Sequence, residues 1–423
     1  MYKLNVGRDL YLKGRIGWRG LSKDEYLAES EFRIINATAL MDGYVDWENC
    51  GFISEERYEE SPEIMLQEGD ILISKDGTLG KIGYVKNLPF KCTVASGIFV
   101  LRNTIPELLN FDYLYHVLKS HIFKDFISKN KAMGSTINHL YQEDLEQFEL
   151  ELPIISEQDK IAAVLNTFDD KIDVNKEICN NIEHLLSLLY DYWFVQFDFP
   201  DEEGKPYREN GGNMKADQDL HCEIPDRFHT IDIKSIASVI DCLHSKKPAY
   251  CFEDESCYLL SLENLNSDGY VDTRDKFYIS KEDYEVWSSK ITLQKGDFVV
   301  TNAGRAGYIA RVPEGVNCAI GRNITAIRPT TVDSCYFRQF FKSCYFRNQV
   351  STNLDSGSFF MSFNVCSIKS LKILVPDEDT LKRFLDLSRP LVEEIETRQS
   401  ENSDLYGLKN TLLPMLMTGQ VVA

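Results

Sequence analysis

A heptad pattern of apolar positions occurs twice in the chain and is its longest hydrophobic repeat. In segments 153–199 and 376–423, inward positions recur with the spacing 4, 3, 4, 3, and the two series lie 223 residues apart throughout. Such spacing over several heptads is typical of a coiled coil. We therefore predict two long paired helices with apolar contact positions at Ile161, Leu165, Phe168, Ile172, Ile182, Leu189 and Trp193, and at Phe384, Leu391, Ile395, Leu405, Leu412 and Leu416.

The alternative is that each helix packs on its neighbouring domain as an ordinary core helix. The length of the pattern and its second occurrence favour the coiled coil. Pro390 lies inside the second segment, and a proline in a helix interior costs about 3 kcal/mol. We therefore expect the second helix to kink or to begin late.

The segments that precede the two helices also repeat. The sequence DGYVD at 42–46 recurs at 268–272, and LQEGDILIS at 66–74 recurs as LQKGDFVVT at 293–301. A short apolar run that follows a Gly-Asp turn predicts a strand, whereas the spacing near 111–128 predicts a helix. We expect two similar α+β domains, which are called heads below.

The repeat also predicts the domain boundaries. The first head covers 1–152, the central helix 153–199, a linker with the second head 200–375, and the distal helix 376–423. The polar, turn-rich stretch after residue 197 is expected to be the linker. A strand-like run near Ile231 opens the second head without a recognised match in the first, which predicts a shorter N-terminal edge there.

Composition excludes several classes of protein. No run of 18 apolar residues is present, so no membrane-spanning helix is predicted, and the first residues lack the apolar core of a signal peptide. The 11 cysteines are scattered without a Cys-x-x-Cys pair. We therefore predict reduced thiols, a cytoplasmic location and no metal site.

The net charge of −20 seems at odds with nucleic-acid binding, which favours basic proteins. Half of this excess lies on the two helical segments, with a net charge of −6 for 153–200 and −4 for 376–423. Acidic residues there can solvate the outward faces of the helices. Contact with DNA would therefore need local basic loops on an acidic body.

No catalytic motif is present. The chain lacks the HExxH and GxSxG motifs, and it lacks the NPPF- or DPPY-type tetrapeptide of an amino-methyltransferase. The glycine-rich stretch 75–83 does not match a phosphate-binding loop, because two residues separate Gly77 from Gly80 and Ile82 follows the lysine. We predict no catalytic residues.

Several loops combine basic, hydroxyl or amide side chains with glycine or an aromatic residue, and such loops can contact phosphates and base edges. The alternative is that they are solvated turns, and that the stretch around Trp18 is a strand with a core tryptophan. The candidate DNA contacts are Arg15, Trp18, Arg19, Lys75, Thr78, Lys81, Ser135 and Thr136 in the first head, and Lys246, Lys247, Asn302, Arg305, Arg322 and Ser358 in the second.

The order of these segments resembles the DNA-specificity subunit of type I restriction–modification enzymes. The resemblance rests on LPIISEQDKIAAVL from 152, on GDILISKDGTLGKIGYV at 69–85 and on the terminal LLPMLMTGQV at 412–421. It implies two target-recognition domains that each read half of a split DNA sequence. It also implies an antiparallel pairing of the two helices, a pseudo-twofold arrangement and a spacer role for the helices.

The resemblance further implies a prokaryotic cytoplasmic location and a non-catalytic subunit whose partners are double-stranded DNA, two methyltransferase subunits and motor-nuclease subunits. S-adenosylmethionine, ATP and magnesium would belong to those partners and not to this chain. The competing hypothesis is a two-headed scaffold that binds proteins only, which the acidity of the chain supports.

Overall fold

The computed structural model describes residues 2–15, 20–41, 43–76, 79–130, 139–253, 255–265, 269–273, 276–303, 306–353, 355–356, 361–417 and 420–421. The chain forms two compact units, Met1–Asp173 with Asp404–Ala423, and Val174–Ser403. Each unit contains one head and parts of two long helices, α6 (Ile155–Phe194) and α11 (Glu378–Met417). The α+β fold class is confirmed.

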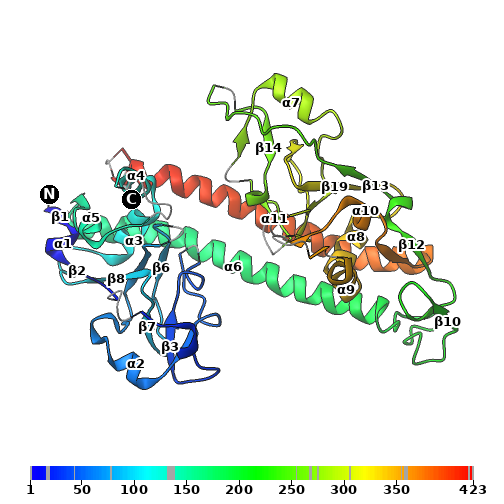
Figure 1. The fold of residues 1–423 in the computed structure, drawn as a ribbon, viewed down its shortest axis with the longest axis horizontal. Helices are drawn as coiled ribbons and strands as arrows, with labels where there is room; N and C mark the ends of the chain where they lie inside the picture. Colours follow the sequence, from blue (N-terminus) through cyan, green and yellow to red (C-terminus); the bar gives the residue numbers. More distant parts are fainter. Residues whose placement is uncertain are drawn as a thin grey trace. The chain divides into compact units, whose positions relative to one another are not determined.

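The head of the first unit is built from three small sheets (Figure 1). A four-stranded sheet has the order β2-β8-β5-β6, a three-stranded sheet has the order β4-β3-β7, and β1 pairs with β9. The strands are β1 (Tyr2–Asn5), β2 (Leu10–Gly14), β3 (Phe32–Ile35), β4 (Gly51–Ile53), β5 (Ile71–Ser74), β6 (Ile82–Tyr84), β7 (Lys91–Val94), β8 (Ile98–Asn103) and β9 (Glu149–Leu152). The helices are α1 (Val6–Asp9), α2 (Glu55–Glu59), α3 (Phe111–Lys119), α4 (His121–Lys129) and α5 (Gln142–Glu146).

The head of the second unit has the same strand order. Its sheets are β13-β19-β16-β17, β15-β14-β18 and the pair β12-β22, with two additional hairpins, β10-β11 and β20-β21. The strands are β10 (Met214–Asp217), β11 (Cys222–Pro225), β12 (His229–Asp232), β13 (Ala237–Asp241), β14 (Tyr258–Leu260), β15 (Phe277–Tyr278), β16 (Phe298–Thr301), β17 (Ile309–Arg311), β18 (Ala319–Ile320), β19 (Ile324–Pro329), β20 (Asp355–Ser356), β21 (Met361–Ser362) and β22 (Lys372–Val375). The helices are α7 (Lys281–Trp287), α8 (Ser334–Lys342), α9 (Cys344–Asn353) and α10 (Val365–Lys369).

The first head is not shorter at its N-terminal edge, so this expectation was wrong. Strand β1 pairs with β9 through Tyr2 opposite Leu152, and β12 pairs with β22 through His229 opposite Val375. The two N-terminal strands therefore correspond at an offset of 227. The sequence concealed this match because β1 is short and of its residues only Leu4 is buried.

The repeated Gly-Asp turn is a buried electrostatic anchor in both heads. Asp70 accepts a hydrogen bond from the backbone of Gln67 and a charge-assisted bond from Arg102, whose Nε lies 2.7 Å from Oδ1. Asp297 pairs in the same way with Arg328 at 2.8 Å. Both carboxylates are at most 1% exposed, so each depends on its arginine for compensation of the buried charge. The Asp–Arg pair joins β5 to β8 in the first head, and its counterpart joins β16 to β19 in the second head.

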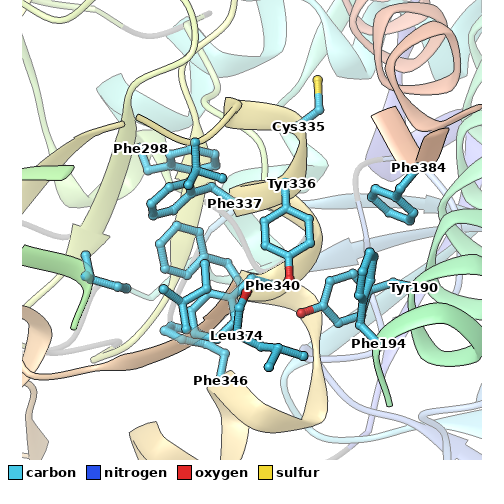
Figure 2. Close-up of a cluster of buried hydrophobic side chains, with 14 of the residues drawn as sticks. Tyr190, Phe194, Phe298, Cys335, Tyr336, Phe337, Phe340, Phe346, Leu374 and Phe384 are labelled. Carbon is cyan, nitrogen blue, oxygen red and sulfur yellow. Dashed lines mark hydrogen bonds between the residues drawn. The ribbon is translucent and has the colours of Figure 1, made fainter. Parts of the chain in front are cut away.

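The long helices pair antiparallel within each unit and also complete the core of its head. In the second unit, Cys179 lies near Ile395, and the ring centroids of Trp193 and Phe384 are 5.8 Å apart. The cluster around them includes Tyr190, Phe194 and Tyr336 (Figure 2). The long helices therefore pair with each other, as predicted. They also pack in the core of a head, as the alternative hypothesis stated.

In the first unit, the opening turns of α6 and the end of α11 share one core with α3. Ile161 and Leu165 belong to the same buried cluster as Leu413 and Leu416. All thirteen apolar positions predicted for the helix contact are buried or half-buried. Within the described residues, no helix is long and apolar enough to cross a membrane.

Helix α11 does not begin late, because it is continuous from Glu378 to Met417 although it contains Pro390. Pro390 is exposed, so the carbonyl that loses its helical donor lies at the surface. The predicted linker after residue 197 connects α6 to β10 through turns, and it is packed, because the buried ring of Phe199 stacks on Tyr207 at 4.7 Å and on Phe228 at 5.2 Å.

Candidate nucleic-acid interface

Half of the predicted DNA-contact residues lie outside the described part of the chain. These are Trp18, Arg19, Thr78, Ser135, Thr136, Arg305 and Ser358. The remaining seven can be placed.

Arg15 is a structural residue and does not lie on a DNA-accessible surface. Its side chain is 1% exposed, and its Nε donates to the carbonyl oxygen of Val94 at 3.0 Å. Burial lowers the pKa of this guanidinium. The side chain therefore ties the end of β2 to β7, and the predicted DNA contact at Arg15 is contradicted.

Lys75 and Asn302 occupy equivalent positions at the ends of β5 and β16. The backbone of Lys75 donates to Gly97, and the backbone of Asn302 donates to Asn323. The amide of Asn302 is bonded within the fold, because Nδ2 donates to Phe363 at 2.9 Å and Oδ1 accepts from Thr325 at 3.0 Å. Asn302 therefore anchors the loop, and its contact with DNA stays a prediction.

Lys75 is half-buried, as Asn302 is. The Nζ of Lys75 lies 4.8 Å from the centroid of the Phe99 ring. Burial lowers the pKa of Lys75. Its ammonium group therefore lies at the edge of the loop region with part of its hydration removed.

The first head contains a basic hollow of about 560 Å³ between the turn after β5 and helices α3 and α4. The hollow is lined by three lysines, of which Lys81 was predicted from the sequence. The lining residues are Met41, Leu79, Gly80, Lys81, Ile82, Leu118, Lys119, Lys124, Ile127 and Ser128.

The second head contains a hollow of about 620 Å³ at the corresponding place. Gly307 corresponds to Gly80, whereas Lys342 and Arg347 correspond to Lys119 and Lys124. Residues of both long helices line this hollow as well, among them Lys176, Glu183 and Gln399. The repeat therefore keeps two cations at matching positions in the two hollows.

Glycine turns bring the backbone close to one of these cations in each head. Gly43 has φ 98° and Gly269 has φ 77°, a region that favours glycine. A β-carbon at Gly43 would lie 2.8 Å from Nζ of Lys119, and one at Gly269 would lie 3.4 Å from Cε of Lys342. The turns hold the lysine stems at the rims of the hollows.

An acidic residue offsets part of the charge in the second hollow. Nζ of Lys342 lies 2.7 Å from Oε1 of Glu183, which also pairs with Arg338. Burial acts to raise the pKa of Glu183, but Arg338 and Lys342 outweigh it and lower that pKa. The carboxylate stays ionised, so Arg347 supplies much of the uncompensated positive charge of this hollow.

A third hollow, of about 170 Å³, brings together two predicted residues that are far apart in the sequence. Lys247 follows β13, and Arg322 lies in the turn between β18 and β19. Phe277, Trp287 and Glu263 also line this hollow. Lys246 is exposed beside Lys247. Of the predicted contacts, Lys247 and Arg322 are the pair that the fold joins in one site.

Sequence reasoning missed Lys119, Lys124, Lys342 and Arg347. These residues lie on or directly beside helices whose apolar spacing indicated only core packing. The signal that could have found them is the repeat itself, because a basic residue recurs at an offset of 223 in both cases.

One group of possible metal ligands occurs among the described residues. Ligand atoms of Asp241, Cys242 and His244 lie within 4.8 Å of one another. Burial raises the pKa of the Cys242 thiol, and the ammonium of Lys290 lies 3.1 Å from the carbonyl oxygen of Cys242. A protonated thiol beside a cation is a poor metal ligand, so we assign no metal to this group.

The chain is similar in sequence to specificity subunits of type I restriction enzymes. Residues 19–184 match the family model of the type I restriction modification DNA specificity domain. The Type I restriction enzyme MjaIX specificity subunit of Methanocaldococcus jannaschii is 24% identical over 87% of this chain and 81% of its own. The putative MjaX specificity subunit of the same organism is 20% identical over 95% of this chain and 90% of its own.

A solved structure described as the type I restriction-modification S subunit from M. genitalium covers 98% of this chain and 95% of its own. Its identity is 16% and its TM-score is 0.48. Residues 19–184 therefore carry a type I restriction modification DNA specificity domain, and the relatives that extend over both heads are specificity subunits of type I restriction enzymes.

Proposed function

We propose that this chain recognises a bipartite DNA sequence, one half with each head, and that it holds the other subunits of a type I restriction–modification complex. The observation that carries the proposal is the duplicated head with a duplicated basic hollow. The frame is the same in both heads, whereas the loops beside it differ in sequence. Two similar but non-identical heads suit two different half-sites.

The two basic hollows support DNA binding on an acidic chain. Lys119 and Lys124 in the first head, and Lys342 and Arg347 in the second, present cations at matching positions. Such side chains bind phosphates without reading sequence and position a protein on the duplex. Base reading would then fall to the loops, whose residues differ between the heads.

The long helices support a spacer role. Their repeat keeps an offset of 223 along its whole length, whereas motifs in the N-terminal part of each head, such as DGYVD and the Gly-Asp turn, lie 226 or 227 apart. Insertions have therefore been accepted in the heads and not along the helices. The helices would set the number of unread base pairs between the half-sites.

An exposed apolar stripe on α6 supports the docking of a methyltransferase subunit. Val174, Leu185, Leu188 and Tyr192 share one face of the helix, and the two leucines are at least half exposed. One position of this stripe recurs as an exposed leucine on α11, where Leu408 corresponds to Leu185. A recurring exposed leucine on the two helices fits two copies of one partner. Motor-nuclease subunits, S-adenosylmethionine, ATP and magnesium would complete the system outside this chain.

The test is a methylation assay of the assembled complex. The full chain is combined with its modification subunits and S-adenosylmethionine, and the methylated positions are mapped on a random-sequence DNA library. We expect one split consensus with a fixed spacer. Methylation without any bipartite consensus would exclude the proposal. Tight assembly with partners but no DNA binding at low salt would instead support the protein-only scaffold.

A further inference from the structure

The third hollow is lined by side chains that differ from those at the matching described positions of the first head, and we propose that it receives one base of the second half-site after that base has left the duplex stack. This inference rests on the proposed function. It means that the two heads recognise bases with different side chains. Its cavity of about 170 Å³ is smaller than a typical small-molecule site of roughly 300–1,000 Å³. A single planar ring suits this size.

The walls of the hollow provide the groups that a nucleobase needs. Phe277 and Trp287 are aromatic, and base–aromatic stacking contributes about 1–3 kcal/mol per base. Lys247 and Arg322 donate hydrogen bonds, and the carboxylate of Glu263 can accept one. Aromatic faces combined with donors and an acceptor match the faces and edges of a base better than they match a bare phosphate.

The position of Lys247 is held by an aromatic ring. Its Nζ lies 3.8 Å from the centroid of Phe277, within the range of a cation–π contact. Arg322 is exposed and makes no ion pair with any residue that the structure describes. One cation is therefore placed in advance and the other remains available for a ligand.

The rim of the hollow contains a residue with a positive φ. Asn323 has φ 63°, at the position of Gly97 in the first head. Asparagine is one of the non-glycine residues that tolerate this region best. The backbone of Asn302 donates to the carbonyl of Asn323 at 2.8 Å and holds the turn in place.

An exposed aromatic pair lies beside the hollow and can displace a base. The ring of Phe252 is 87% exposed and lies 4.7 Å from the ring of Tyr250. Tyr250 in turn contacts Phe277 edge-on, at 5.5 Å between centroids. Apolar side chains inserted between base steps unstack them at a cost of a few kcal/mol. Phe252 is placed to unstack a base next to the hollow.

The equivalent region of the first head is closed. The strand pairing places Gly51 where the second head has Phe277, and the ring of Tyr26 packs against Gly51, 2.7 Å from where a β-carbon would lie. Ser61 and Ser96 stand at the positions of Trp287 and Arg322. In the described part of the first head, the positions of Phe277, Trp287 and Arg322 therefore carry neither an aromatic ring nor a cation.

The experiment uses the full chain assembled with its modification subunits and a duplex that contains its methylated site. The fluorescent bases 2-aminopurine and pyrrolocytosine replace each base of both half-sites in turn, and the methylated base itself is left out of the comparison. We expect fluorescence to rise about threefold or more at one position of one half-site, because an unstacked base is less quenched. Phe252→Ala should abolish that rise.

Substitutions in the hollow separate this inference from a general loss of binding. Arg322→Ala and Lys247→Ala should weaken binding about tenfold and remove the fluorescence rise. Lys295→Ala is the matched control, because this exposed lysine of the same head pairs only with Glu314 among the described residues. A specific complex in which no position brightens, or in which Arg322→Ala leaves the rise unchanged, would overturn the inference but leave the proposed function intact. Loss of all sequence preference in the unmodified chain would instead overturn the proposed function.

Discussion

The side-chain amide of Asn175 donates to Oδ1 of Asn402 at 2.9 Å, across the contact between α6 and α11. Asn175 is fully buried and Asn402 is 9% exposed. A polar pair inside an apolar helix contact fixes the register, because any shift of one helix would leave both amides unpaired. These two residues therefore define how the second unit aligns its helices.

Replacing one member of this pair should cost more than replacing both. Asn175→Leu leaves the amide of Asn402 with one partner fewer, which should lower the free energy of unfolding by about 1–3 kcal/mol. The double variant Asn175→Leu, Asn402→Leu should recover most of that loss. Thermal unfolding of the four proteins in a double-mutant cycle measures the coupling. Additive losses would show that the two amides act independently.

The Gly-Asp anchors should act separately on the two units. Asp70→Ala removes a buried carboxylate and leaves Arg102 without its partner, which should destabilise the first unit by about 3 kcal/mol. Hydrogen exchange should then accelerate in β5 and remain unchanged in β16. Asp297→Ala is the matched control and should give the reverse pattern. Equal effects of either substitution on both strands would contradict local anchoring.

Acid should weaken the first unit through His116. This ring is fully buried, its Nε2 lies 2.9 Å from Asn166, and burial together with Lys409 lowers its pKa to about 4. Asp169 and Asp112 act in the opposite direction. Folding therefore favours the neutral ring, and its contribution is complete above the ordinary pKa of 6.5 and is lost as the pH falls toward about 4. The loss amounts to about 3 kcal/mol.

The measurement for His116 is the free energy of unfolding of the first unit between pH 7 and pH 4. His116→Gln should reduce the slope of stability against pH in that window. His244→Gln, at an exposed histidine of the second unit, should leave the slope unchanged. An unchanged slope in the His116 variant would show that other groups cause the acid sensitivity.

The basic hollows should contribute affinity without sequence preference. Lys119→Ala and Lys124→Ala should each weaken DNA binding and reduce the slope of log affinity against log salt by about 1. The methylated consensus should not change. Lys3→Ala is the control, since this exposed lysine lies on β1 and pairs with Glu149. A changed consensus at one base position would reveal a base reader in place of a phosphate contact.

The exposed stripe on α6 should control assembly and not folding. Leu185→Ser and Leu188→Ser should each weaken binding of the modification subunit about tenfold. Burial of one leucine side chain in an interface contributes roughly 1.5–3 kcal/mol, and each substitution removes that contribution. Titration calorimetry with the isolated partner measures this loss. Val286→Ser removes an equally exposed residue of α7 and should bind normally. Undiminished assembly in both leucine variants would place the partner elsewhere.

Part of the candidate site could be predicted from the sequence. Lys81, Lys247 and Arg322 were identified from loop composition, and the structure places each of them in a hollow. Arg15 and Asn302 were chosen for the same hydrogen-bonding side chains, but both side chains form hydrogen bonds within the protein. Residue type does not reveal whether a polar group is already satisfied, because its partner comes from another part of the chain.

The sequence by itself determined the duplicated architecture, the two long helices and the Gly-Asp turns, because heptad spacing and turn chemistry act over a few residues. The strand β1 and the open hollow beside Arg322 were decided only by tertiary structure. Only Leu4 is buried in β1, so the apolar pattern does not predict this strand. Its hydrogen-bonded pairing with β9 is what makes the segment a strand. Phe277 and Trp287, which line the hollow, stand where the first head has Gly51 and Ser61. Cavities depend on contacts between distant segments, and those contacts leave no periodic signal along the chain.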